Sequence, residues 1–205
     1  MIKMVAIIDY GAGNILSVQK ALDHIGCENV VTSDASVISG ADGAILPGVG
    51  SFGDAMDHLS AGGLVGAVKE FAASGKPFLG ICLGLQVLFD ASEESPEAAG
   101  LSVFPGSVRR FPADIGLKIP HIGWNSIEYD RECPIFKGLS DHPYVYFVHS
   151  YYLQAKDESV VSAVADYGMK FHAAVWKDNV VATQFHPEKS GSVGLQILRN
   201  FAGLI

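Results

Sequence analysis

A cysteine between two glycines is the first feature of this sequence that could carry out chemistry. Cys82 lies in Gly80-Ile-Cys-Leu-Gly84, directly after the apolar run 78–81, which has the length and composition of a buried strand. The apolar segment 85–89 can begin a helix, so the pattern predicts a cysteine nucleophile at a sharp strand-to-helix turn. Glycines on both sides leave room for a strained central residue, and N–H groups at the start of the helix would favour a thiolate.

A histidine and a glutamate far along the chain supply what a cysteine nucleophile needs. The apolar run 180–183 leads into His186-Pro187-Glu188. A thiolate nucleophile works with a histidine base, and the histidine needs an acceptor that orients its ring. Taken separately, Cys82 as a small buried hydrophobic residue and His186 as a structural residue are simpler interpretations. Together, with Pro187 restricting the backbone between the two polar residues, they predict catalysis by Cys82, His186 and Glu188.

The composition of the 205-residue chain limits the classes of protein to which it can belong. With 49% hydrophobic residues, 18% charged residues and 23 glycines, it is typical of one compact α/β domain spanning residues 1–205. A net charge of −8 and the lack of a basic stripe argue against nucleic-acid binding. Asp9 interrupts the first apolar run, and no apolar segment is long enough to span a membrane, so we expect neither a signal peptide nor a membrane anchor.

Cysteine usage indicates a reducing compartment. The three cysteines, Cys27, Cys82 and Cys133, are odd in number and widely spaced, which argues against a disulfide framework and favours the cytoplasm. The sequence contains no Cys-x-x-Cys pair and no His/Cys cluster, so we expect no metal centre. We also expect no cofactor.

The hydrophobic pattern predicts an α/β fold whose two halves differ. In the first half, apolar runs alternate with segments of helical periodicity, which predicts an open, largely parallel central sheet with flanking helices. In the second half the strands become short and turn-rich, which predicts antiparallel additions and a hairpin turn at residues 177–179. The expected strands are 4–8, 29–32, 42–46, 78–81, 102–104, 107–111, 121–129, 144–149, 159–164, 173–176 and 179–183, and the expected helices are 15–25, 55–59, 64–73 and 192–201.

Two glycine-rich loops follow strands of the predicted sheet, at the edge where open α/β sheets bind ligands. The loop 47–53 can aim backbone N–H groups at a developing oxyanion, although an ordinary strand-to-helix connection is an equally simple interpretation. The loop 9–14 contains Gly11-x-Gly13, but Leu16 stands where a nucleotide-binding motif would have its third glycine. We therefore interpret loop 9–14 as a tight turn, and residues 92–97 as a polar surface loop.

Taken together, these motifs resemble the class I, or triad, glutamine amidotransferases, and the resemblance covers nearly the whole chain. It implies a flavodoxin-like fold and hydrolysis of L-glutamine to glutamate and ammonia by Cys82, His186 and Glu188, without a cofactor. Within this family, the chain is most similar to the glutaminase subunits of imidazole glycerol phosphate synthase, which act in histidine biosynthesis. The segments that carry this similarity are 9–14, 47–52, 121–125, 146–151 and 185–190.

The resemblance also implies roles for residues around the nucleophile. Backbone N–H groups of Leu83 and of Val49, beside Gly50, would form the oxyanion hole, with Val49 turning towards the nucleophile after a peptide rearrangement. Gln86 would bind the amino-acid end of the substrate, although an exposed helix residue is the simpler interpretation of this glutamine. The other implied substrate-binding residues are Gly48, His149, Ser150 and Tyr151.

The partner implied by the resemblance is a cyclase subunit with a (β/α)8 barrel that forms a heterodimer with the glutaminase. This partner would receive ammonia through a tunnel and make imidazole glycerol phosphate and an aminoimidazole carboxamide ribonucleotide. The implied interface residues are Asn14, Trp124 and Lys189, with a core position as the alternative for Trp124. The chain ends soon after the amidotransferase motifs, as we expect of a separate subunit.

Three other functions remain open from the sequence. The chain could serve another synthase, such as anthranilate or aminodeoxychorismate synthase, although segments 10–14 and 121–125 argue against this. It could be a stand-alone cysteine hydrolase of the same fold. It could also be a binding subunit without catalysis, against which the intact Cys82, His186 and Glu188 argue.

Overall fold

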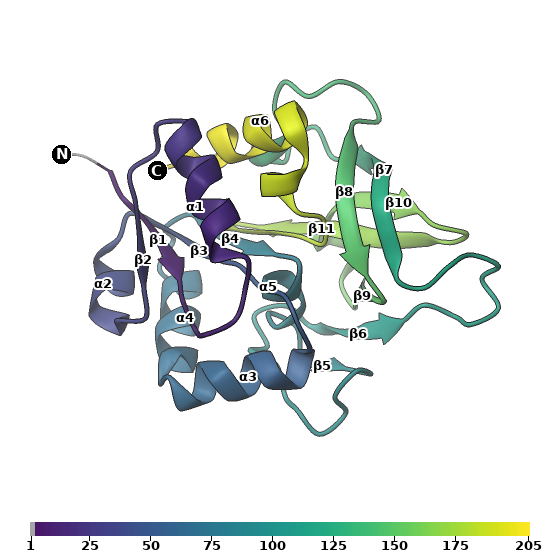
Figure 1. Cartoon of the computed structure of the whole chain (residues 1–205), viewed down its shortest axis with the longest axis horizontal. Coiled ribbons are helices and arrows are strands. Elements are labelled where there is room, and N and C mark those ends of the chain that lie inside the picture. Colours follow the sequence, from purple (N-terminus) through teal and green to yellow (C-terminus); the bar gives the residue numbers. More distant parts are fainter. Residues whose placement is uncertain (1–2) are drawn as a thin grey trace.

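A mixed sheet of 12 strands forms the centre of the computed structural model, which describes residues 3–205 (Figure 1). Met1 and Ile2, which belong to the segment where we expect no signal peptide, lie outside the described residues. Five neighbouring strands run parallel, which confirms the predicted, largely parallel central sheet. In sheet order, they are β2 (Asn29–Thr32), β1 (Val5–Ile8), β3 (Gly43–Leu46), β4 (Phe78–Ile81) and β12 (Val180–Thr183).

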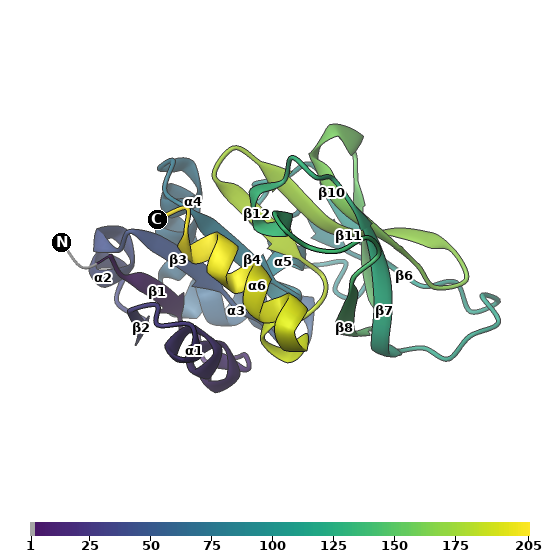
Figure 2. The same ribbon diagram turned by 90° about the horizontal axis from the view of Figure 1, so that it is seen from above.

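Helices cover both faces of the parallel strands because these strands are apolar on both sides. In β1, Ala6 and Ile8 belong to one hydrophobic cluster, while Val5 and Ile7 belong to another on the opposite face. Figures 1 and 2 show the two helical layers that bury these clusters. The first cluster includes residues of α2 (Ala35–Gly40), α3 (Phe52–Ala61) and α4 (Leu64–Ala73), and the second includes residues of α1 (Ile15–His24) and α6 (Gly191–Ala202).

The second half of the chain extends the sheet with antiparallel strands, on the side away from β2 (Figure 2). β12 pairs with β11 (Lys170–Lys177) in the predicted hairpin, where Asp178 has a φ of 53°. Next in sheet order are β10 (Val161–Asp166), β7 (His121–Tyr129) and β8 (Tyr144–His149), while β9 (Tyr151–Ala155), β6 (Gly106–Arg110) and β5 (Ala91–Ser92) branch from β11. Short 3-10 helices occur at η1 (Pro134–Phe136), η2 (Glu158–Val160) and η3 (Pro187–Lys189).

The structure corrects some of the predicted elements. Residues 102–104 form no strand; this run is apolar because Phe104 is buried and stacks on Phe89, with ring centroids 5.4 Å apart. Residues 92–97 are not purely a surface loop, because Ser92 and Ser95 are buried. Neither α2 nor β9 was predicted. Asp34 caps the start of α2 by accepting from two backbone N–H groups, and an aspartate at this position is a sequence signal for the start of a helix.

The carboxyl ends of β1, β3, β4 and β12 bring distant segments together at one edge of the sheet. Loop 9–14 and loop 47–50 touch there, since a Cβ atom on Gly13 would lie 3.7 Å from the Pro47 side chain. Cys82 follows β4 at the same edge, and His186 follows β12 after a short extension. Within residues 3–205, no helix combines the length and apolar character needed to cross a membrane.

Candidate active site

Cys82 lies at the sharp turn between β4 and α5 (Leu83–Gln86). Its backbone has φ 55° and ψ −106°, a region that residues with side chains rarely adopt. Both flanking glycines are required by close packing: a Cβ atom on Gly84 would lie 1.9 Å from the Leu46 carbonyl oxygen, and one on Gly80 would lie 2.9 Å from the Gly84 carbonyl oxygen. The strained turn is present as predicted, but the helix ends at Gln86 instead of continuing through residue 89.

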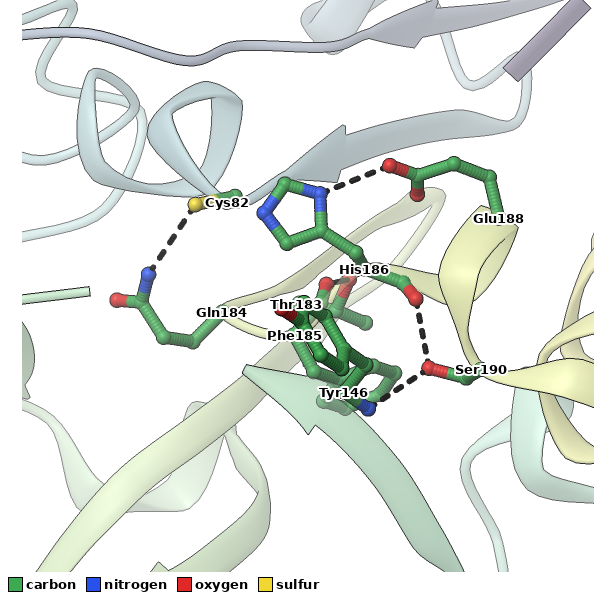
Figure 3. Close-up of polar contacts among 8 residues, drawn as sticks. All are labelled: Cys82, Tyr146, Thr183, Gln184, Phe185, His186, Glu188 and Ser190. Carbon is green, nitrogen blue, oxygen red and sulfur yellow. Dashed lines mark hydrogen bonds and ion pairs between the residues drawn. The ribbon is translucent and has the colours of Figure 1, made fainter. Parts of the chain in front are cut away.

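His186 and Glu188 form a buried pair just beyond the end of β12. His186 Nδ1 lies 2.8 Å from Glu188 Oε1, and both side chains are only 1% exposed. The ring directs its second nitrogen, Nε2, towards the Cys82 sulfur (Figure 3), and Nε2 has no hydrogen-bond partner among residues 3–205. The structure therefore brings the three predicted catalytic side chains together.

A serine that was not predicted holds the backbone of His186. The Ser190 hydroxyl donates to the His186 carbonyl oxygen over 2.6 Å and accepts from the Tyr146 N–H over 3.0 Å (Figure 3). Tyr146 belongs to β8, so this hydroxyl ties the segment that carries His186 to the antiparallel part of the sheet. Ser190 is buried and directly follows η3, and its position in the sequence carries no signal of this role.

Interactions with its two neighbours favour the charged form of His186. Burial alone lowers the pKa of His186, but its polar interactions with the Cys82 and Glu188 side chains, and their negative charges, outweigh burial and raise this pKa to about 10. The imidazolium is therefore the stable form at neutral pH when Cys82 is a thiolate and Glu188 is ionised. Such a pair supplies both a nucleophile and a proton donor for a leaving amine.

A pocket of about 400 Å³ opens beside the Cys82 sulfur. Except for Gly48, all predicted oxyanion-hole and substrate-binding residues line it, namely Val49, Gly50, Leu83, Gln86, His149, Ser150 and Tyr151. Gly48 packs behind this surface, where an added Cβ would come within 2.7 Å of the Leu83 side chain and the Tyr10 hydroxyl. Glu94, Pro120 and Val148 also line the pocket and were not predicted as site residues.

Gln86 is buried, so the interpretation of an exposed helix residue is wrong. Its side-chain Nε2 donates to the Tyr151 carbonyl oxygen over 3.2 Å and to Gln184 Oε1 over 3.1 Å. Both amide hydrogens of Gln86 are therefore engaged within the protein, which leaves its Oε1 as the atom available to a ligand.

Two neutral histidines brace the wall of the pocket. His149 Nδ1 lies 2.8 Å from the Tyr151 carbonyl oxygen, and His149 Nε2 lies 3.0 Å from His121 Nδ1. A carbonyl only accepts, so His149 must donate from Nδ1 and accept from His121 at Nε2. Burial lowers the pKa of His149 to about 3 and that of His121 to about 4, and both rings are neutral at pH 7.

The loop carrying Val49 is free to change its peptide orientation. Val49 is 41% exposed, and Gly50 has a φ of +107° with no atom within 4 Å of a Cβ added to it. Among residues 3–205, no hydrogen bond holds the backbone of Gly48, Val49 or Gly50. A rearrangement of the Gly48–Val49 peptide would therefore break no hydrogen bond of this structure.

The three residues implied for a partner interface lie on connected elements. Trp124 is 54% exposed, so a core position is wrong for it, and its ring packs edge-on against Tyr146. Lys189 Nζ lies 5.9 Å from the centre of the same Tyr146 ring and also lines the pocket. Asn14 is half-buried before α1, which packs against η3. No group of three or more His, Cys, Asp or Glu side chains within residues 3–205 is arranged to hold a metal.

Comparisons with known proteins define the class to which the fold and site belong. The family model of the class-I glutamine amidotransferases matches residues 6–203, and the chain belongs to this family. Solved structures of low identity share its fold. A glutamine amidotransferase has a TM-score of 0.76 at 22% identity, covering 98% of this chain and 97% of its own, and PurLQS from Thermotoga maritima has a TM-score of 0.77 at 18% identity, covering 99% of each.

Relatives of higher identity share one name. Imidazole glycerol phosphate synthase subunit HisH of Syntrophotalea carbinolica is 55% identical, covering 98% of this chain and 100% of that protein. The protein of the same name from Bacillus cereus is 52% identical, covering 98% of this chain and 95% of its own length. The protein of the same name from Geobacter sulfurreducens is 51% identical, covering 96% of this chain and 97% of its own length.

Proposed function

We propose that this chain is the glutaminase subunit of an imidazole glycerol phosphate synthase, which hydrolyses L-glutamine to glutamate and ammonia for histidine biosynthesis. The observation that carries this proposal is the buried array of Cys82, His186 and Glu188 beside a pocket. It occurs in a chain that is 55% identical over nearly its whole length to a relative of that name. The chain acts as one amidotransferase domain in the cytoplasm.

In the proposed reaction, the Cys82 thiolate attacks the side-chain amide carbon of glutamine. His186 then donates its Nε2 proton to the leaving nitrogen, the carbon–nitrogen bond breaks, and ammonia departs. Neutral His186 next takes a proton from water, which hydrolyses the γ-glutamyl thioester and releases glutamate with the thiolate restored. Glu188, 2.8 Å from Nδ1, keeps the ring oriented through both steps.

Two backbone N–H groups would stabilise the oxyanion of this reaction. Leu83 follows the nucleophile directly, at the start of α5, where N–H groups are free to bind an anion. Val49 supplies the second N–H after the Gly48–Val49 peptide turns, which the glycines and the lack of hydrogen bonds in this loop permit. Loss of one such donor typically lowers the rate about 100-fold or more, so the orientation of one peptide can control the release of ammonia.

The substrate would lie in the pocket with its amino-acid end at Gln86. Because both hydrogens of the Gln86 amide bind protein groups, its Oε1 accepts from the substrate ammonium. Backbone groups of His149, Ser150 and Tyr151 line the same wall and complete the site, with Gly48 behind the oxyanion loop.

An exposed apolar face beside the pocket is the proposed docking site of the cyclase barrel in a heterodimer. Ile122 and Trp124 of β7 and Tyr144 of β8 are each more than half exposed. This face adjoins the pocket through Lys189, which packs on Tyr146 and also lines the pocket. A partner bound at this face would enclose the route by which ammonia leaves the pocket. Because this face has no basic stripe, we do not expect it to bind nucleic acid.

The test is the rate of glutamate release by the purified chain, alone and with a cyclase barrel subunit and its nucleotide ligand. We expect weak activity alone and a rise of about 100-fold or more with the loaded partner, since the partner completes the oxyanion hole. The variant Cys82→Ser serves as the control and should be inactive in both conditions. Equal rates with and without the partner would instead favour a stand-alone hydrolase.

A further inference from the structure

Gln184 is a completely buried polar residue to which the reaction described above assigns no role. It lies two residues before His186, and its backbone N–H donates to the Ala173 carbonyl oxygen over 2.8 Å. Its side chain contacts two residues of the site. Gln184 Nε2 lies 3.6 Å from the Cys82 sulfur (Figure 3). Gln184 Oε1 lies 3.1 Å from Gln86 Nε2.

The direction of this contact follows from a group that can only accept hydrogen bonds. The Tyr151 carbonyl oxygen is 3.2 Å from the Gln86 amide, so Gln86 must present Nε2 to it. The second hydrogen of the same Nε2 points at Gln184, which must therefore present its oxygen there. This leaves the Gln184 Nε2–H facing the Cys82 sulfur. A reversed Gln184 amide would place two donors against each other at Gln86.

We propose that Gln184 donates a hydrogen bond that stabilises and aims the Cys82 thiolate. The proposal deepens the proposed function, because it takes Cys82 as the nucleophile. The His186 ring also faces this sulfur, so Gln184 Nε2 and the imidazole both lie beside Cys82 at the edge of the pocket. Hydrogen bonds to an ionised acceptor are about twice as strong as neutral ones. The contact therefore favours the thiolate before attack, and it weakens once the sulfur is a neutral thioester.

The test is the pH dependence of Cys82 alkylation by iodoacetamide in the isolated full chain, followed by mass spectrometry of the peptide that contains Cys82. This readout separates Cys82 from Cys27 and Cys133 and requires no turnover of glutamine. In Gln184→Met, a side chain of similar length has no donor. We expect the pH midpoint of alkylation to rise by about 1 unit or more, because a hydrogen bond to a charged group is lost.

Ser162→Ala is the control, because it removes a buried hydroxyl of β10 that has no hydrogen-bond partner among residues 3–205. Its alkylation profile should match that of the unaltered chain. If Gln184→Met does not fold, as judged by circular dichroism, Gln184→Leu removes the same donor without adding a charge, and the midpoint should again rise. An unchanged midpoint in the folded variant would overturn the proposal, whether or not the chain hydrolyses glutamine.

Discussion

Cys82 occupies a backbone conformation that costs a residue with a side chain on the order of 1–3 kcal/mol. Its surroundings impose this conformation: the Cys82 N–H donates to the Thr183 carbonyl oxygen over 2.7 Å, and Gly84 packs against the backbone of β3. Cys82 as a whole is only 7% exposed, yet its sulfur faces both the pocket and the ring of His186. Strain at this residue is therefore tied directly to the placement of the nucleophile.

Replacing Glu188 by Gln should lower the pKa of His186. The carboxylate favours the imidazolium by its charge and by its bond to Nδ1, so the ring should lose its proton at least about 1 pH unit lower without it. The ring would also be held in the wrong orientation or tautomer for part of the time, and glutaminase activity should fall about 100-fold or more. NMR titration of the His186 ring carbon measures the first effect, and glutamate release measures the second.

The control for Glu188→Gln is Glu94→Gln, which makes the same change at a half-buried residue of the pocket. Glu94 accepts from the Phe52 N–H over 2.8 Å and has no contact with His186. Its replacement should leave the titration of His186 unchanged. A His186 titration in Glu188→Gln that coincides with that of the unaltered chain would show that the pair does not set the charge of the ring.

At the scale of elements, the turn between β4 and α5 depends on the contact of α5 with β3. In Gly84→Ala, the new methyl group would meet the Leu46 carbonyl oxygen at 1.9 Å, and this backbone cannot move away without disturbing the sheet. We expect the free energy of unfolding to fall by about 3 kcal/mol or more. Urea denaturation followed by circular dichroism provides the measurement.

Gly66→Ala is the matched change, because Gly66 is an exposed residue of α4 with open space around it. Alanine is the better helix former, so this variant should gain about 0.5–1 kcal/mol of stability. If Gly84→Ala were as stable as the unaltered chain, the close approach of α5 to β3 would not be required for folding.

The pairing of β7 with β8 should make stability depend on pH through His121 and His149. Their pKa values, about 4 and about 3, lie below that of an unfolded histidine, so the unfolded chain binds more protons as the pH falls below about 6.5. Stability should therefore fall between pH 6.5 and 4. His121→Gln removes one titrating group, and its loss of stability between pH 7 and pH 5 should be smaller by about 1–2 kcal/mol. Urea denaturation at each pH measures the free energy of unfolding. If this free energy fell equally between pH 7 and pH 5 in His121→Gln and in the unaltered chain, the prediction would be contradicted.

At the scale of the whole molecule, the exposed face of β7 and β8 should serve a partner and not the stability of the chain. Trp124→Ala should leave the melting temperature nearly unchanged, because Trp124 is 54% exposed. It should weaken binding to the cyclase subunit by about 2 kcal/mol, or roughly 30-fold, as for aromatic residues at the centre of interfaces. Isothermal titration calorimetry measures this affinity.

Leu204→Ala is the control for Trp124→Ala. Leu204 is 42% exposed near the carboxyl terminus, and Figure 1 shows this terminus at the opposite end of the molecule from β7 and β8. Its replacement should not change the affinity for the cyclase. Equal losses of affinity in both variants, or in neither, would place the interface elsewhere.

The parts of this protein that depend on local pattern can be predicted from the sequence. Fully buried parallel strands appear as continuous apolar runs, so β1, β3, β4 and β12 could be predicted. The nucleophile and the His-Pro-Glu segment could be predicted because the strained turn and the neighbouring orienting acceptor both need particular residues within a few positions. The helices α4 and α6 followed from apolar periodicity and glycine boundaries.

Contacts between distant residues depend instead on how the whole chain folds. The chain leaves β8 and enters β9 at Ser150, and the apolar pattern of residues 144–155 does not reveal this change because the two strands differ only in their pairing partners. The pair of His121 and His149 depends on the register of β7 against β8, and Gln184 meets Cys82 because β12 lies beside β4. Hydrogen bonds between residues about a hundred positions apart cannot be predicted from local sequence, because the packing of whole strands determines which residues become partners.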